Sequence, residues 1–285
     1  MRILIDKELG ILPLWNVNGT SLYFEVYGRG TPLIFIHGFG LTHEMFGPQI
    51  EFFKRSCKIV LVDLRGNGQS GKLMVPNDSI IETQCEDLSI LLAYLGIKRA
   101  VLVGVSYGGV LAQKFSQLFP DQVSAIIISD SFSKNVMTTI PGKMLYAITA
   151  VGWLSYYLPG EFFIRSLKIM YYRWDLAYRA IRKGILEKRS RELHKQRIAV
   201  SRIDYTHFLP LIEVPVLCIV GANTLTGVRH MKETAKLLAN VRFEVIEDSY
   251  DPSNLCQPQR FNESVQHFLE ENHLIETNGL IQRYS

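Results

Sequence analysis

A serine flanked by glycines is the residue of this sequence best suited to chemistry. Ser106 lies in Gly104-Val105-Ser106-Tyr107-Gly108, which has the spacing Gly-x-Ser-x-Gly. An apolar run at 100–104 precedes it, and a pattern of helical periodicity at 107–118 follows. Glycines on both sides permit a sharp turn from strand to helix that leaves the serine hydroxyl exposed. This context predicts a nucleophile elbow with Ser106 as the nucleophile; a chance glycine-rich turn is the alternative.

The segment His37-Gly38-Phe39-Gly40 follows the apolar run at 32–36 and forms a second motif. A loop at this place can supply a backbone N–H that binds an oxyanion together with the N–H of the residue after the nucleophile. We therefore expect the N–H groups of Phe39 and Tyr107 to form an oxyanion hole, with His37 beside the substrate. A tight glycine turn without this role is the alternative.

These motifs lie among short apolar strands that alternate with helical patterns. Asn18-Gly19 is a strong hairpin signal between two strand-like runs. Strands are expected at 11–17, 21–27, 32–36, 58–62, 100–104, 125–129, 214–220 and 242–246, and helices at 79–95, 107–118 and 258–270. Such alternation predicts an α/β fold with a mostly parallel sheet covered by helices on both faces. The polar segment at 63–70 is expected to be an ordered loop that shapes this scaffold and does not react.

The alternation stops after about residue 132 and resumes near residue 210. The region 133–209 is helical in pattern, rich in aromatic residues and basic, with 14 Lys or Arg against 5 Asp or Glu. We expect two units: an α/β core formed by residues 1–132 and 210–285, and an inserted helical cap formed by residues 133–209. Solvated helix faces explain the basic charge as well as an acidic ligand or an anionic surface does.

These segments together resemble the α/β-hydrolase fold family, in particular its cap-bearing esterase, lyase and dehalogenase-like members. The resemblance extends from about Val17 to Leu269 and includes Leu95-Gly96-Ile97, Val214-Pro215-Val216-Leu217, Gln257-Pro258 and Phe261-Asn262. It implies that the cap lies over the nucleophile and supplies most of the substrate pocket. The aromatic residues of the cap then indicate a small apolar substrate or ligand, although at least half of them are expected to form the cap's own core.

Two positions depart from the family pattern, in which an acid and then a histidine follow the nucleophile. The acid's turn reads Gly221-Ala222-Asn223-Thr224, so that Thr224 stands in its place. The Gly-His pair, seven residues before the proline of the last helix, is replaced by Tyr250-Asp251. The catalytic triad is therefore incomplete by residue type, and we expect Thr224 and Tyr250 to line the substrate site.

Two carboxylates are the candidate replacements. Asp251 could serve as the base if burial raised its pKa, because the ordinary value of about 3.9 is too low for an efficient base. Asp130 directly follows the strand after the elbow helix, where some members of the fold carry their acid; an ordinary turn cap is the alternative. Among the histidines, His207, near the return from the cap to the core, is the least implausible replacement for the missing residue.

The sequence thus predicts a serine hydrolase that acts on an apolar ester or thioester through Ser106, with an unconventional or impaired base. Two alternatives remain: a catalytically silent homologue that binds a small molecule, and a lyase or cyclase in which Asp251 moves a proton without an acyl-enzyme. No metal or other cofactor is expected.

Composition and charge limit the partners and the cellular location that we expect for this protein. A net charge of +4 is too small to indicate a nucleic-acid partner, and the four scattered cysteines indicate buried thiols, neither disulfides nor a zinc site. The charged N-terminal segment does not have the pattern of a secretory signal, and the apolar run at 144–158 is shorter than the roughly 20 residues of a membrane span. We expect a cytoplasmic protein without stable membrane insertion; the oligomeric state stays open.

Overall fold

The structure is a computed structural model that describes residues 14–135 and 157–276. Its strands are β1 (Leu14–Val17), β2 (Thr20–Tyr27), β3 (Thr31–Ile36), β4 (Cys57–Asp63), β5 (Ala100–Val105), β6 (Val123–Ser129), β7 (Val216–Gly221) and β8 (Val241–Ile246). Its helices are α1 (Gly47–Phe53), α2 (Ile80–Tyr94), α3 (Tyr107–Leu118), α6 (Glu161–Met170), α7 (Asp175–Leu186), α8 (Ser190–Val200), α9 (Leu225–Ala235), α10 (Ser253–Cys256) and α11 (Pro258–Glu271).

The strands form one sheet of eight, in the order β1-β2-β4-β3-β5-β6-β7-β8. The first two strands are joined at Asn18-Gly19 and run antiparallel to their neighbours, whereas β4, β3, β5, β6, β7 and β8 are mutually parallel. Parallel strands bring their carboxyl ends to one edge of a sheet, where ligands of open α/β sheets bind. The loops that follow β3, β5, β6 and β8 therefore lie on the same side of the molecule.

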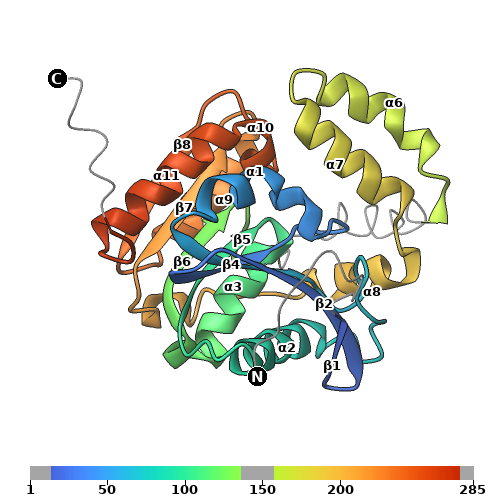
Figure 1. Cartoon of the computed structure of the whole chain (residues 1–285). Coiled ribbons are helices and arrows are strands. Elements are labelled where there is room, and N and C mark those ends of the chain that lie inside the picture. The colour runs from blue at the N-terminus through green and yellow to red at the C-terminus, as the bar shows by residue number, and fades with distance from the viewer. Residues whose placement is uncertain (1–13, 136–156, 277–285) are drawn as a thin grey trace.

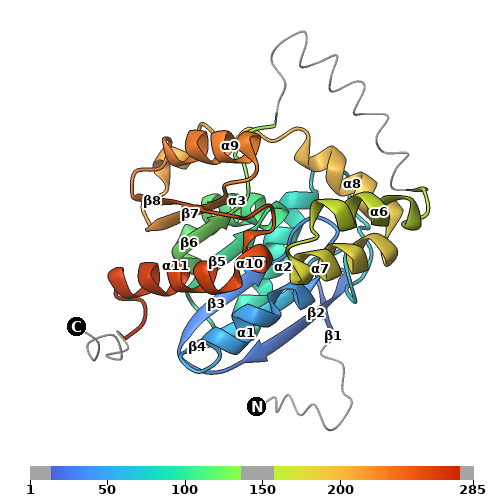
Figure 2. The same ribbon diagram turned by 90° about the horizontal axis from the view of Figure 1, so that it is seen from above.

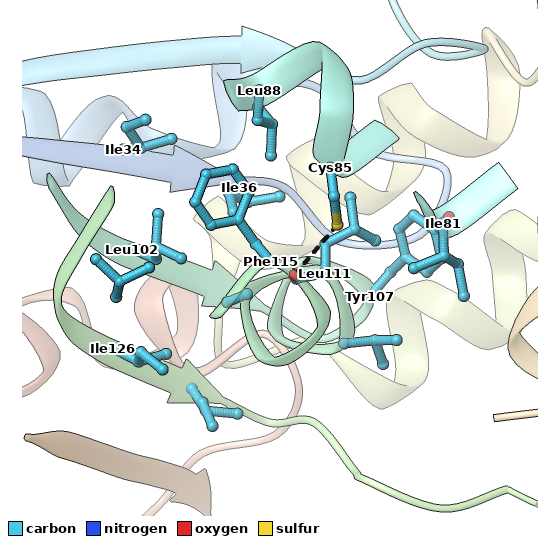
Figure 3. Close-up of a cluster of buried hydrophobic side chains, with 14 of the residues drawn as sticks. Ile34, Ile36, Ile81, Cys85, Leu88, Leu102, Tyr107, Leu111, Phe115 and Ile126 are labelled. Atoms are coloured by element: carbon cyan, nitrogen blue, oxygen red, sulfur yellow. Dashed lines mark hydrogen bonds between the residues drawn. The ribbon is translucent and has the colours of Figure 1, made fainter. Parts of the chain in front are cut away.

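Alternate side chains of the central strands enter two separate hydrophobic clusters. Ile34 and Ile36 of β3 pack with α2 and α3, whereas Leu33 and Phe35 pack on the opposite face with residues of α1 and α11. Figure 3 shows the first cluster, in which Ile34, Ile36, Leu102 and Ile126 of the strands face Leu111 and Phe115 of α3. The strands are buried on both faces, which explains why they read as continuous apolar runs rather than as an alternation.

The predicted α/β-hydrolase fold is confirmed, and the predicted strands and helices are observed with ends shifted by up to two residues at those ends that the structure describes. Helices α1, α9 and α10 were not among the expected helices. The seven residues of α1, Gly-Pro-Gln-Ile-Glu-Phe-Phe, and the four of α10 are too few to show a helical period. The expected strand at 11–17 lies partly outside the described residues.

The chain between β6 and β7 carries helices α6, α7 and α8, which we call the insertion helices. Figures 1 and 2 show α6 and α7 as a pair set off from the sheet, beside the end where α10 lies. The aromatic residues Tyr146, Trp153 and Tyr156 of the expected cap lie outside the described residues. The unit boundaries at 132/133 and 209/210 remain a prediction.

All four cysteines are free and buried, as predicted. In the part of the chain that the structure describes, no helix is long and apolar enough to cross a membrane. No group of three or more His, Cys, Asp or Glu side chains within these residues could hold a metal ion.

Candidate active site

Ser106 joins β5 to α3 in a conformation that non-glycine residues rarely adopt. Its φ of 53° and ψ of −112° place it in a strained region, and its side chain is partly exposed. The Ser106 N–H donates to the carbonyl of Ser129 at the end of β6, at 2.7 Å, and so ties the turn to the neighbouring strand. This is the geometry of the nucleophile elbow that the sequence predicts.

The glycines around Ser106 are required by close packing. A Cβ on Gly108 would lie 1.9 Å from the carbonyl oxygen of Ile36 at the end of β3, and one on Gly104 would lie 2.3 Å from the carbonyl oxygen of Gly108. Real Cβ contacts are never this short, so a larger residue would displace α3 from the sheet. The Gly-x-Ser-x-Gly spacing therefore lets β3, β5 and α3 approach one another around the serine.

The loop after β3 lies against the elbow. A Cβ on Gly38 would lie 3.6 Å from the Cβ of Ser106, and the rings of Phe39 and Tyr107 meet edge to face with centroids 6.2 Å apart. As the first residue of α3, Tyr107 has an N–H with no acceptor inside its helix. The two N–H groups assigned to the oxyanion hole thus come from segments that are in contact, which supports the assignment without testing it.

His37 has a different position from the one expected. Its side chain is fully buried; Nε2 accepts a hydrogen bond from the Leu64 N–H at 3.0 Å, and Nδ1 lies 2.9 Å from the Gly38 carbonyl oxygen, to which it therefore donates. Burial lowers the pKa of His37, which keeps the ring neutral. Because both ring nitrogens serve the backbone, the expectation that His37 contacts a substrate is not supported. His37 instead joins the loop after β3 to the loop after β4.

Asp251 lies beside Ser106. Burial, and next the negative charge of Asp130, raise the pKa of the Asp251 carboxyl group to about 8, while the neighbouring Ser106 side chain lowers it. A carboxylic acid with this pKa is a base only above neutral pH. Sequence alone could identify the position, whereas the raised pKa follows from the surroundings.

Asp130 directly follows β6, close enough to Asp251 for its charge to act on that residue. Its Oδ2 accepts hydrogen bonds from the Ser253 N–H at 2.7 Å, the Ser253 hydroxyl at 2.6 Å and the Ser129 hydroxyl at 2.9 Å, and its Oδ1 accepts from the Gly221 N–H at 2.8 Å. Burial raises the pKa of Asp130, and these hydrogen bonds oppose that effect. Four donors favour the ionised form, so Asp130 holds the negative charge and Asp251 holds the proton at neutral pH.

Asp130 also contacts the turn in which Thr224 stands at the family's acid position. Its carboxylate accepts a hydrogen bond from the N–H of Gly221, the first residue of that turn. Thr224 stands at the start of α9, and the described part of the chain contains no hydrogen-bond partner for its hydroxyl. The ring of Tyr250 packs against Trp174 of the insertion, at a centroid distance of 5.2 Å, and against Tyr171 at 6.0 Å. Roles for Thr224 and Tyr250 in substrate binding remain predictions.

Contacts with the insertion hold the Asp251 loop in place. The Tyr171 hydroxyl donates to the backbone carbonyl of Asp251, and Trp174 Nε1 donates to the carbonyl of Asp248 at 3.0 Å. Arg173 forms an ion pair with Asp248 at 2.8 Å. Sequence reasoning treated these aromatic residues only as a group, and no local motif indicated Tyr171 or Trp174.

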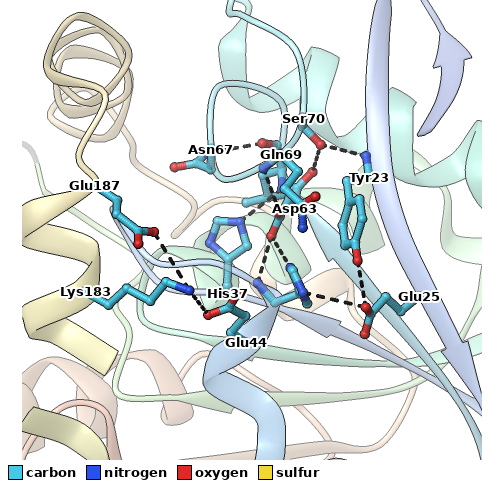
Figure 4. Close-up of polar contacts among 12 residues, drawn as sticks. Tyr23, Glu25, His37, Glu44, Asp63, Asn67, Gln69, Ser70, Lys183 and Glu187 are labelled. Atoms are coloured by element: carbon cyan, nitrogen blue, oxygen red, sulfur yellow. Dashed lines mark hydrogen bonds and ion pairs between the residues drawn. The ribbon is translucent and has the colours of Figure 1, made fainter. Parts of the chain in front are cut away.

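A polar cluster beside the oxyanion loop was also missed. Asp63, at the end of β4, accepts hydrogen bonds from the backbone N–H and from Nδ1 of His43, each at 2.8 Å, and from the Gln69 N–H at 2.8 Å (Figure 4). These bonds fix the turn at His43–Phe46, which follows the glycine-rich segment after β3. The segment at 63–70 is therefore an ordered loop built around Asp63, as its sequence predicts.

Comparison with known proteins identifies the family. A family model described as alpha/beta hydrolase fold matches residues 31–255. The chain belongs to the α/β-hydrolase fold family. A relative from Bacillus subtilis (strain 168), the AB hydrolase superfamily protein YisY, is 38% identical over 96 residues, which are 33% of this chain and 35% of that protein. The chain thus matches only about a third of that relative's length.

Other relatives match over nearly their whole length. The 3-oxoadipate enol-lactonase 1 of Acinetobacter baylyi (strain ATCC 33305 / BD413 / ADP1) is 24% identical over 258 residues, 90% of this chain and 95% of the lactonase. Among solved structures, a thermophilic esterase from Thermogutta terrifontis superposes with a TM-score of 0.74 at 23% identity, covering 92% of this chain and 98% of the esterase. These likenesses agree with the fold and leave the substrate of this chain open.

Proposed function

We propose that this α/β-hydrolase is a serine hydrolase of apolar carboxylic esters or thioesters, with Ser106 as nucleophile and ionised Asp251 as base. The observation that carries the proposal is the strained elbow turn at Ser106, with the Asp251 carboxyl group close enough for the Ser106 side chain to act on its pKa. Esterases and lactonases among the relatives and structural neighbours, which by name cleave ester bonds, add support.

The chemistry follows from the positions of these groups. The Ser106 oxygen attacks the carbonyl carbon of the ester, and its proton passes to the Asp251 carboxylate. The carbonyl oxygen becomes an oxyanion, which the N–H groups of Phe39 and Tyr107 stabilise. The bond to the leaving alkoxide or thiolate then breaks, and that group takes the proton from Asp251. Water reverses these steps on the acyl-serine and releases the acid.

A pH profile of aryl-ester hydrolysis tests the proposal. With a pKa of about 8, Asp251 is ionised in only about a tenth of the molecules at pH 7. We expect kcat/KM to rise about tenfold per pH unit at low pH and to level off above about pH 8. Asp251→Asn should remove the rise, and Ser106→Ala should remove both turnover and labelling of the protein by a fluorophosphonate. Absence of labelling and of turnover at about pH 9 would refute the proposal.

A second candidate is a silent homologue that binds a small apolar molecule without consuming it. The same pKa favours it, because at neutral pH the protonated Asp251 leaves Ser106 without a base. The two candidate functions predict different results for aryl-ester hydrolysis above about pH 8. A binding protein would return an aryl ester intact at alkaline pH and bind it equally well after Ser106→Ala.

A further inference from the structure

Helix α6 presents large apolar side chains to solvent. Phe162 is 73% exposed, Ile169 is 75% exposed, and Tyr172, just beyond the helix, is 77% exposed. Residues seven apart lie on one side of a helix, so Phe162 and Ile169 share a face. Leu167, on the opposite side, is buried. Exposed apolar side chains grouped in this way mark an interaction site more often than isolated ones do.

Cations surround these apolar side chains. Arg165 and Lys168 are exposed on α6 itself, and residues 161–186 contain six Lys or Arg against two Asp or Glu. Arg165, Lys168 and Arg182 form no ion pair with another residue of the described chain. This face therefore combines apolar side chains with uncompensated positive charge.

The face points away from the rest of the molecule. Helix α6 packs against α7, and α7 contacts α10 of the core. Figure 2 shows α6 at the outer margin of the molecule, with α7 between it and the α10 end of the core. We use the term α6 surface for Phe162, Arg165, Lys168, Ile169 and Tyr172.

We propose that the α6 surface docks the protein peripherally on an anionic lipid bilayer. Aromatic and aliphatic side chains enter the boundary between headgroups and acyl chains, and the basic side chains pair with anionic headgroups. Tyr172 has an apolar ring and a polar hydroxyl, which suits that boundary. The charge complementarity points to an anionic bilayer, because a nucleic acid would use the cations but not exposed Phe162 and Ile169. Docking of this kind requires no membrane-spanning helix.

Vesicle sedimentation of the purified full chain tests this proposal. We expect the protein to sediment with vesicles of mixed phosphatidylcholine and phosphatidylserine and to stay in solution with pure phosphatidylcholine. The double variant Phe162→Ser, Ile169→Ser should lower the partition coefficient at least about tenfold, since each side chain loses its apolar contact with lipid. The double variant Arg165→Gln, Lys168→Gln should lower the partition coefficient about fivefold for each cation removed. Added salt should also lower the partition coefficient of the wild type.

Matched controls lie on other parts of the surface. Leu211 is also largely exposed, and Leu211→Ser should leave sedimentation unchanged; so should Lys98→Gln with Lys236→Gln, which removes two exposed cations elsewhere. The proposal is overturned if the wild-type protein does not sediment with the mixed vesicles, or if the two double variants of the α6 surface sediment with them as the wild type does. A dimer that the Phe162→Ser, Ile169→Ser variant abolishes, without vesicle binding by wild type, would assign the α6 surface to a second copy of this chain and also overturn the proposal.

Discussion

Ser106, Asp251 and Asp130 occupy the places proposed for the nucleophile, the base and the acid, but Asp251 is an aspartate where the family pattern has a histidine. Four hydrogen-bond donors favour the ionised form of Asp130, close to Asp251. Sequence reasoning placed the usual acid position at Thr224, in the turn after β7, and named Asp130 as a candidate replacement because it directly follows β6. The contact between Asp130 and Ser253 joins residues 123 positions apart, and no local pattern could reveal it.

This arrangement predicts that one substitution restores a triad. Asp251→His would place an imidazole between Ser106 and the Asp130 carboxylate, and general-base catalysis contributes about 10²- to 10⁴-fold. We expect kcat/KM for an aryl ester at about pH 7 to rise at least about 100-fold. Steady-state kinetics of the variant and the parent measure the gain.

Two further variants establish which acid acts. Asp130→Asn in the Asp251→His background should abolish most of the gain, because the imidazole then lacks its charged partner. Thr224→Asp in the same background should add little. If Thr224→Asp is instead required for activity, the acid belongs to the turn after β7, and the assignment of Asp130 is wrong.

The loop after β3 depends on Asp63 and His43. Burial lowers the pKa of His43, but the hydrogen bond and charge of Asp63, with the charges of Glu25 and Glu44, raise it above its ordinary 6.5. Burial raises the pKa of Asp63, yet the hydrogen bond and charge of His43 and the hydrogen bond from the Gln69 N–H lower it below its ordinary 3.8. His43 and Asp63 therefore form an ion pair that fixes the turn behind Phe39.

Removal of this pair should destabilise the fold in a pH-dependent way. Asp63→Asn removes the carboxylate 2.8 Å from the buried His43 ring and leaves it with the more distant Glu25 at 3.9 Å, and we expect a loss of about 3 kcal/mol in the free energy of unfolding, measured with urea. The raised pKa of His43 means that its contribution is lost as pH rises through that pKa. The lowered pKa of Asp63 means that its contribution is lost as pH falls through that value.

The difference between wild type and Asp63→Asn should therefore be largest between about pH 4 and about pH 6.5. Glu51→Gln, which breaks the exposed pair with Lys54, is the control and should change stability by less than about 0.5 kcal/mol. A difference that does not vary with pH would contradict an ion pair at His43 and Asp63.

The sequence predicts most of the architecture because each central strand is a short apolar run and each long helix has a clear period. It predicts less where structure depends on distant contacts. His37 follows a strand in a motif typical of an oxyanion loop, yet its direction is set by the Leu64 N–H of another loop. Tyr171 and Trp174 belong to an aromatic-rich region in which composition cannot distinguish a side chain that touches the Asp251 loop from one that faces solvent.

The segment between α6 and α7 contacts the loop at 248–252, which carries Asp251. Trp174 and Arg173 both contact Asp248, and Tyr171 contacts Asp251. Trp174→Phe removes the hydrogen bond to the Asp248 carbonyl and leaves a cavity, with an expected cost of about 2 kcal/mol. Because these contacts hold the loop from outside, amide hydrogen exchange should accelerate at 248–252 and at 161–171 more than in β5 or α3.

Arg179→Ala is the matched control, since among the described residues Arg179 forms its ion pair with the exposed Asp175 on its own helix, and it should leave exchange at 248–252 unchanged. If Trp174→Phe accelerates exchange evenly over the whole chain, the loop has no separate dependence on the insertion. If exchange rises chiefly at 248–252 and 161–171, the position of the Asp251 carboxyl group beside Ser106 depends on packing of the insertion, and the same variant should reduce the alkaline turnover of aryl esters.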